Sequence, residues 1–217
     1  RYRALAAKRG LSITTGVDFE RIEAVDDGLR MHYSLKGRPA SADADVILTA
    51  TGQSPVTADL GLSEIAVKTD ERGFVIVDSH LRTSQPHIFA AGDVTGGWML
   101  AHVASHEGTL AAENALGGDR EMDYSAVPNA VFTDPEIAGV GMTEADAKAA
   151  GRSVGVARFP LSASGRALTM GEEDGLVRLV YDTETTRVLG VHMMGAHASE
   201  LIAEGALAVS AGLTVSD

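Results

Sequence analysis

The stretch Pro-His-Ile-Phe-Ala-Ala-Gly-Asp at residues 86–93 decides the fold, together with Met-Leu-Ala-His at residues 99–102. The first of these predicts a short buried strand over residues 88–91 that ends in Gly92 and Asp93. A carboxylate at the carboxyl end of a strand faces the crevice where open α/β sheets bind their ligands. Asp93 could therefore accept hydrogen bonds from sugar or ribityl hydroxyls. The alternative is that Asp93 only caps a turn.

Residues 99–102 supply the second half of the pattern. After a turn at residues 95–97, they open a helix that we expect from about residue 100 to residue 116, where Gly117 stops it. The first N–H groups of a helix lack partners within it and can donate to a ligand. The apolar stripe of this helix is predicted at Leu100, Val103, Ala104, Ala111, Ala112 and Ala115.

These two motifs resemble the flavin-binding segment of the FAD-dependent pyridine nucleotide–disulfide oxidoreductases. Within that family, residues 99–102 followed by His-Glu-Gly at residues 106–108 are similar to the dihydrolipoamide dehydrogenase branch. The resemblance implies that Asp93 binds ribityl or ribose hydroxyls of FAD. It also implies that four residues pass the flavin ring and donate backbone N–H groups: Met99, Leu100, Ala101 and His102. Such donors would stabilise negative charge on the reduced flavin.

Three further segments resemble other parts of the same family. Ala-Thr-Gly-Gln-Ser-Pro at residues 50–55 is similar to the end of the NAD domain, which implies that the Gly52 backbone approaches NAD. Most relatives carry Arg after that glycine, whereas this chain has Gln53. A plain strand-to-loop glycine is the alternative. Residues 127–141 and 158–168 resemble the dimerisation domain, and an ordinary structural hairpin domain is their alternative.

The resulting fold class is an α/β nucleotide-binding fold, part of a flavoprotein with two dinucleotide-binding domains, followed by an α+β interface or dimerisation domain. Residues 1–53 are expected to form the latter part of the NAD-binding domain. Residues 54–123 are expected to complete the FAD-binding domain. Residues 124–217 correspond to the dimerisation domain, truncated at its C-terminus.

Local patterns predict the remaining elements. Helices are expected over residues 1–10, from a Thr143 cap to Gly151, and over residues 197–212. The inner face of the last helix is predicted at Leu201, Ile202, Gly205, Ala208 and Val209. Strands are expected over residues 11–17, 19–25, 29–35, 45–52, 74–77, 154–159, 176–181 and 188–193. Turns are expected at residues 26–28 and 36–39, and a hairpin loop at residues 182–187.

Composition narrows the function classes. The 217 residues are 45% hydrophobic and 22% charged, as in soluble globular proteins. The net charge of −12 argues against nucleic acid or an anionic membrane as a partner. No apolar run approaches the ~20 residues that span a bilayer, and the first residues lack an apolar signal core. We therefore expect a cytoplasmic protein.

The chain has no cysteine, which removes disulfides, thiolate metal sites and cysteine nucleophiles from these residues. The family works through a cysteine pair and a His-Pro histidine with a nearby Glu, but here His87 follows Pro86. No Gly-x-Gly-x-x-Gly motif occurs. The resemblance implies that the cysteines and glycine motifs precede Arg1 and the His-Glu pair follows Asp217. We therefore expect no catalytic residue here, and no lipoamide activity from these residues alone.

No metal site is expected. His102 and His106 are four residues apart and could share a helix face, but no third ligand follows from their spacing. The remaining histidines are scattered along the chain.

The resemblance implies a flavoprotein disulfide oxidoreductase. It would oxidise protein-bound dihydrolipoamide and pass electrons through a cysteine pair and FAD to NAD. It would act as a homodimer, with the lipoyl domain of a 2-oxo acid dehydrogenase complex as partner. One alternative lies within the family: a mercuric or glutathione reductase-like enzyme, or a soluble transhydrogenase. The other is a non-catalytic flavin-binding dimerisation module, which fits the absence of cysteine.

Overall fold

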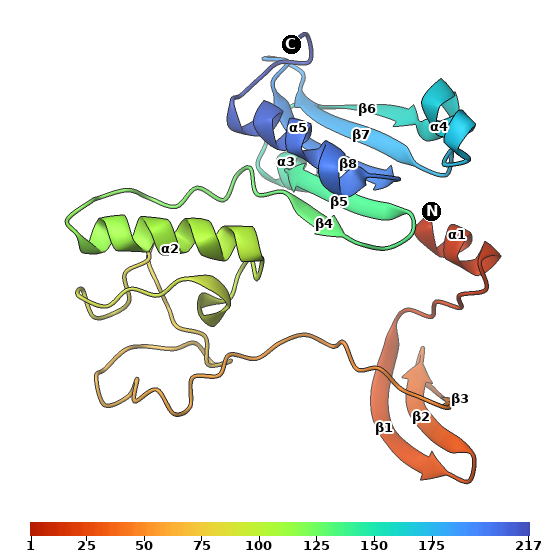
Figure 1. Cartoon of the computed structure of the whole chain (residues 1–217), viewed down its shortest axis with the longest axis horizontal. Helices are drawn as coiled ribbons and strands as arrows, with labels where there is room; N and C mark the ends of the chain where they lie inside the picture. The colour runs from red at the N-terminus through yellow and green to blue at the C-terminus, as the bar shows by residue number, and fades with distance from the viewer. The chain divides into compact units, whose positions relative to one another are not determined.

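The computed structural model describes residues 1–217, which form two compact units, residues 1–53 and 54–217. The first contains helix α1 (Tyr2–Lys8) and a three-stranded antiparallel sheet in the order β1-β2-β3 (Figure 1). Its strands are β1 (Val17–Val25), β2 (Gly28–Leu35) and β3 (Arg38–Ala44).

The hairpin predicted across residues 26–28 is confirmed, and the turn predicted at residues 36–39 forms with one change. Lys36 and Gly37 both adopt positive φ, as a tight two-residue hairpin turn requires. The turn is therefore shorter than predicted, and Arg38 already pairs with Leu35 in the unpredicted strand β3. Residues 11–16 form no strand, so the prediction for residues 11–17 is wrong except at its last residue. Nothing in these residues pairs with the sheet.

Little of the first unit is buried. Leu5 and Ala6 are its only buried residues, and neither lies in the sheet. Polar contacts cross the exposed strands instead. Arg30 donates two hydrogen bonds to Asp43, at 2.6 and 2.8 Å.

The buried strand predicted over residues 45–52 is wrong. These residues are irregular, and Val46 and Leu48 are 79% and 89% exposed. An apolar run becomes a buried strand only where neighbouring strands accept its backbone hydrogen bonds. This chain places no strand beside residues 45–52.

The second unit begins with irregular chain that leads to the 3-10 helix η1 (Gly92–Thr95) and helix α2 (Ala101–Ala115). Strands were predicted over residues 74–77 and 88–91. The structure has only isolated bridges there, between Thr69 and Val75 and between Arg82 and Phe89. Residues 88–91 are half-buried rather than buried. Each segment meets its neighbour at one bridge, which is too short a contact to build a regular strand.

The buried face of α2 differs from the predicted stripe. Val103 and Ala111 are buried as predicted, whereas Ala112 and Ala115 are exposed. The buried set follows helical spacing but includes two polar residues: Val103, Glu107, Leu110, Ala111 and Asn114. Leu110 and Ala111 pack on Leu81 in a small core. The prediction failed where it assumed that only apolar side chains face inward.

The rest of the second unit is a five-stranded antiparallel sheet in the order β4-β5-β8-β7-β6, with helix α5 across one face (Figure 1). The strands are β4 (Asn129–Val131), β5 (Glu136–Gly141), β6 (Val154–Pro160), β7 (Leu176–Asp182) and β8 (Val188–Gly195). The helices are α3 (Glu144–Ala149), η2 (Leu161–Ala163), α4 (Gly165–Met170) and α5 (Ala198–Ser210). The predicted strands at β6, β7 and β8 are confirmed. Strand β5 and helix α4 had no prediction.

The core of this sheet lies beneath α5. It is formed by Ala138, Val140, Val188, Val191, Ala198 and Ile202. Gly205 lets α5 approach the sheet, because a Cβ there would lie 2.9 Å from Cβ of Val191. Ile202 and Gly205 were predicted on the inner face correctly, but Leu201 is 56% exposed. The helix turns its contact face toward small residues and leaves Leu201 on the outside.

We expect Thr143→Ala to lower the free energy of unfolding by about 1 kcal/mol, measured by urea denaturation. Thr143 caps α3 as predicted, in a capping box with Asp146. Its hydroxyl accepts the Asp146 N–H, and the Asp146 carboxylate accepts the Thr143 N–H. Thr109→Ala, on the exposed side of α2, is the matched control and should change the free energy by less than about 0.5 kcal/mol. Equal effects of the two variants would contradict the capping role.

Candidate functional site

The backbone around Gly92 is fixed from three sides. Its N–H donates to Oε2 of Glu107 at 2.6 Å, and its carbonyl accepts the Thr95 hydroxyl at 2.9 Å. Gly92 has φ of 79°, and a Cβ there would lie 3.1 Å from Cβ of Ala104. Only glycine combines this conformation with such a close approach to α2. The 3-10 helix η1 is thereby held against the first turns of α2.

Asp93 follows in η1 with its side chain exposed. Its carboxylate accepts no hydrogen bond from the chain, so its oxygens remain available to hydroxyl donors. The strand-end position predicted for Asp93 is wrong, because residues 88–91 form no regular strand. The 3-10 turn presents the carboxylate instead.

The opposite side of η1 packs on an aromatic ring. Gly96 has φ of 74°, and a Cβ there would lie 3.2 Å from the ring of Phe74. The next residue, Val75, donates its N–H to the Val94 carbonyl at 2.9 Å. Phe74 and Val75 are both buried. The loop that carries Asp93 is therefore held between this buried pair and α2.

Helix α2 begins without a side-chain cap. Leu100 is its N-cap residue and forms no side-chain cap bond, and no acidic residue lies in the first turn. Ala104 is the first residue whose N–H bonds back, to the Leu100 carbonyl at 2.9 Å. The N–H groups of residues 101–103 find no acceptor in the chain and carry the positive end of the helix dipole. Met99 and Leu100 lead into this end, with Met99 exposed.

His102 ties this helix end to the chain that enters the five-stranded sheet. Its Nε2 donates to the Pro128 carbonyl at 3.0 Å. The side chain of His102 is thus engaged in a structural contact, which leaves its backbone N–H for a ligand. The backbone role of His102 stays a prediction, and the side-chain contact was not predicted.

Glu107 was also missed by the sequence analysis. It is 2% exposed, and its second oxygen, Oε1, accepts the Tyr124 hydroxyl at 2.6 Å. Burial raises the pKa of the Tyr124 phenol, and the hydrogen bond to Glu107 raises it further, so Tyr124 stays a donor. The signal was present in the sequence: Glu107 lies four residues after Val103 and four before Ala111, on the buried stripe.

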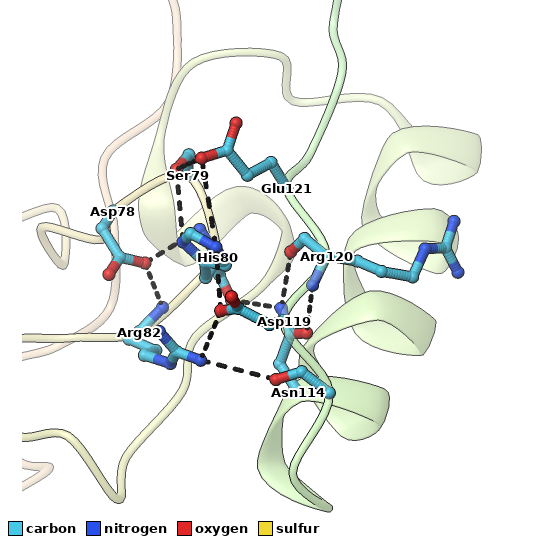
Figure 2. A network of polar contacts seen from close by, with 9 residues as sticks. Asp78, Ser79, His80, Arg82, Asn114, Asp119, Arg120 and Glu121 are labelled. Carbon is cyan, nitrogen blue, oxygen red and sulfur yellow. Dashed lines mark hydrogen bonds and ion pairs between the residues drawn. The ribbon is translucent and has the colours of Figure 1, made fainter.

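A polar network fixes the other end of α2 (Figure 2). The buried Asn114 side chain donates to the His80 and Arg120 carbonyls and accepts the Arg120 N–H. His80 also faces Asp119, with Nε2 at 3.2 Å from the carboxylate. Asp78 turns the chain by accepting the N–H groups of His80 and Arg82. These contacts join the loop at residues 78–82 to residues 119–122, so both ends of α2 are anchored.

The NAD candidate lies in the other unit. Gly52 has φ of 117° and is exposed, and a Cβ there would meet no atom within 4 Å. Its backbone is therefore open to a ligand. The structure brings Asp93 and residues 99–102 to one side of the second unit, while Gly52 belongs to the first.

No group of three or more His, Cys, Asp or Glu side chains is arranged to hold a metal ion. No helix combines the length and apolar character needed to cross a bilayer.

Two family models cover almost the whole chain. Residues 1–108 match the pyridine nucleotide-disulphide oxidoreductase model, and residues 127–217 match the dimerisation domain of the same family. The chain belongs to the pyridine nucleotide-disulphide oxidoreductase family. The family resemblance and the fold class inferred from the sequence are thereby confirmed.

Individual members of the family align along the full chain. Dihydrolipoyl dehydrogenase of Thermus scotoductus is 46% identical over 217 residues, which are 99% of this chain and 47% of that protein. Mercuric reductase of Bacillus cereus is 39% identical over 97% of this chain and 33% of its own length. The crystal structure of LpdA from Mycobacterium tuberculosis superposes with a TM-score of 0.89 at 30% identity, over 99% of this chain and 46% of that one. The chain thus spans about half the length of this dihydrolipoyl dehydrogenase and of LpdA.

We expect Gly92→Ala to destabilise the second unit by about 2–3 kcal/mol, because it adds a steric contact to a left-handed backbone. Gly97→Ala is the matched control. Gly97 also has positive φ, but a Cβ there meets nothing within 4 Å, so about 1–2 kcal/mol is expected. The difference, measured by urea denaturation, reports the packing of η1 on α2. Adding Ala104→Gly should reduce it, and an unchanged difference would contradict this packing.

Proposed function

We propose that the protein containing this chain is a flavoprotein disulfide oxidoreductase that oxidises protein-bound dihydrolipoamide, with NAD as the final electron acceptor. The observation that carries the proposal is the pairing of an unpartnered carboxylate at Asp93 with the uncapped start of α2. The full-length alignment with dihydrolipoyl dehydrogenase at 46% identity supports the choice of substrate. The shared family fold supports the reaction class.

The residues present fit FAD. Ribityl or ribose hydroxyls are donors, and the Asp93 carboxylate offers acceptor oxygens that the chain leaves unused. Carbonyl and ring-nitrogen acceptors of a flavin suit the free N–H groups at the start of α2. Proposed contacts at this end come from Met99, Leu100, Ala101 and His102. Bound FAD would supply the two-electron chemistry, which no side chain of this chain can perform.

The chain's own residues would hold and tune the cofactor. The Asp93 carboxylate orients the hydroxyl-bearing part, and the α2 dipole favours negative charge on the reduced ring. The Gly52 backbone would approach NAD, because it is exposed and carries no side chain. The cysteine pair and the His-Glu pair of the reaction would come from residues other than these 217. These residues alone are therefore proposed to be inactive.

A homodimer is part of the proposal. The residues that match the dimerisation domain leave large apolar side chains exposed, among them Phe132 at 82%, Leu207 at 65% and Leu201 at 56%. Apolar surface of this kind is commonly covered by a partner subunit. The proposed protein partner is a lipoyl domain of a 2-oxo acid dehydrogenase complex. Cytoplasm is the proposed location.

Native mass spectrometry of the protein that contains this chain is the first test. We expect a subunit of about twice 22.6 kDa, present as a dimer and carrying one FAD per subunit. Turnover of dihydrolipoyl domains with NAD, and none with mercuric ion or oxidised glutathione, would support the lipoamide substrate. A 22.6 kDa chain without flavin would contradict the proposal and favour a non-catalytic dimerisation module.

We expect Asp93→Ala in that protein to raise the FAD dissociation constant by about ten- to one hundredfold. A hydrogen bond to a charged group contributes about 1.5–3 kcal/mol. The measurement is fluorescence titration of the FAD-free protein with FAD. Asp123→Ala is a matched control, since its carboxylate accepts hydrogen bonds from the N–H and side chain of Ser125. Unchanged affinity in Asp93→Ala would remove Asp93 from the site.

A further inference from the structure

We propose that Glu107 is a positioning residue for flavin binding, which acts by holding the Asp93 loop on α2. This inference rests on the proposed function, because it concerns the same FAD site. In this proposal the buried Glu107 carboxylate does not contact FAD itself. Glu107 lies seven residues into α2, and its side chain is turned away from solvent.

The contacts of Glu107 divide between two segments. Oε2 accepts the Gly92 N–H at 2.6 Å, one residue before Asp93. Oε1 accepts the Tyr124 hydroxyl at 2.6 Å, from the chain that follows α2. Both partners are neutral donors and their acceptor is a carboxylate, so both hydrogen bonds are charge-assisted and directional. The carboxylate thereby connects η1, α2 and residue 124 through a single buried group.

The bond to Gly92 fixes the direction of the next side chain. The Gly92 N–H is held by Glu107, and its carbonyl is held by Thr95. Both sides of this residue are therefore held, and η1, which carries Asp93, lies against the first turns of α2. Losing the Glu107 carboxylate would leave the buried Gly92 N–H without an acceptor. The loop would then shift toward water, and Asp93 with it.

Tyr124 fixes the carboxylate in turn. Its phenol remains protonated, because burial and the neighbouring Glu107 raise its pKa. The hydroxyl therefore always donates, and it restrains the carboxylate in the orientation that reaches Gly92. A Gln at position 107 could keep both contacts. Its carbonyl would accept from Gly92, and its amide would donate to the Tyr124 oxygen.

The test uses the intact flavoprotein that contains this chain, with FAD removed and titrated back. Glu107→Leu should raise the FAD dissociation constant at least about tenfold, and Glu107→Gln should restore it to within about threefold of the unaltered protein. Glu113→Gln, which removes an exposed carboxylate from the same helix, should leave FAD affinity unchanged. If Glu107→Leu does not fold, Tyr124→Phe decides, with a rise of about threefold expected.

A double-mutant cycle with Asp93 separates positioning from a general loss of stability. If Glu107 acts through Asp93, Glu107→Leu should change FAD affinity by less than about threefold in an Asp93→Ala background. Additive effects of the two substitutions would overturn the inference. Unchanged FAD affinity in both Glu107→Leu and Tyr124→Phe, or an equal loss in Glu107→Gln and Glu107→Leu, would also overturn it. An unaltered protein that binds no FAD would instead refute the proposed function itself.

Discussion

One buried carboxylate organises the candidate site. Glu107 joins α2 to Gly92 and Tyr124, which lie 15 and 17 residues away in the sequence, and each of its oxygens accepts one short hydrogen bond. A buried charge is costly unless every acceptor is used, so the surrounding backbone is held to the geometry that satisfies it. The left-handed Gly92, which packs closely on Ala104, supplies one of the two donors. The exposed Asp93 is placed as a result, although no contact holds its own side chain.

The second unit combines two ways of building rigidity. Around α2, irregular loops are fixed by polar groups: Glu107 at its middle and Asn114 near its end, each buried and hydrogen-bonded. In the five-stranded sheet, rigidity comes from hydrogen bonds between the strands and from apolar packing beneath α5. Binding loops gain from the first arrangement, because polar anchors allow an irregular backbone where a ligand needs it.

The features that the sequence predicted well are those decided by residues close together in the chain. The Thr143 cap and the hairpin at residues 182–187 depend on neighbours within a few residues. Strands β6 to β8 were predicted from the apolar and polar alternation within each strand, although β6 pairs with the more distant β7. Residues 45–52 failed because a strand there needs partners from distant segments. Glu107 was missed because a charged residue on a helix is expected to face solvent. The family was found nonetheless, since the motif at residues 99–102 and 106–108 carries it without any knowledge of the geometry.

The β1-β2-β3 sheet of the first unit has a different physical basis from the rest of the chain. It has no buried residue, and its strands are joined by backbone bonds and by exposed charge pairs such as Arg30 with Asp43. Exposed pairs weaken as salt screens them, whereas apolar packing does not. Rising ionic strength would therefore loosen this sheet while the sheet under α5 holds. The two units are thus expected to differ in their salt response, and amide exchange in β1–β3 would show it first.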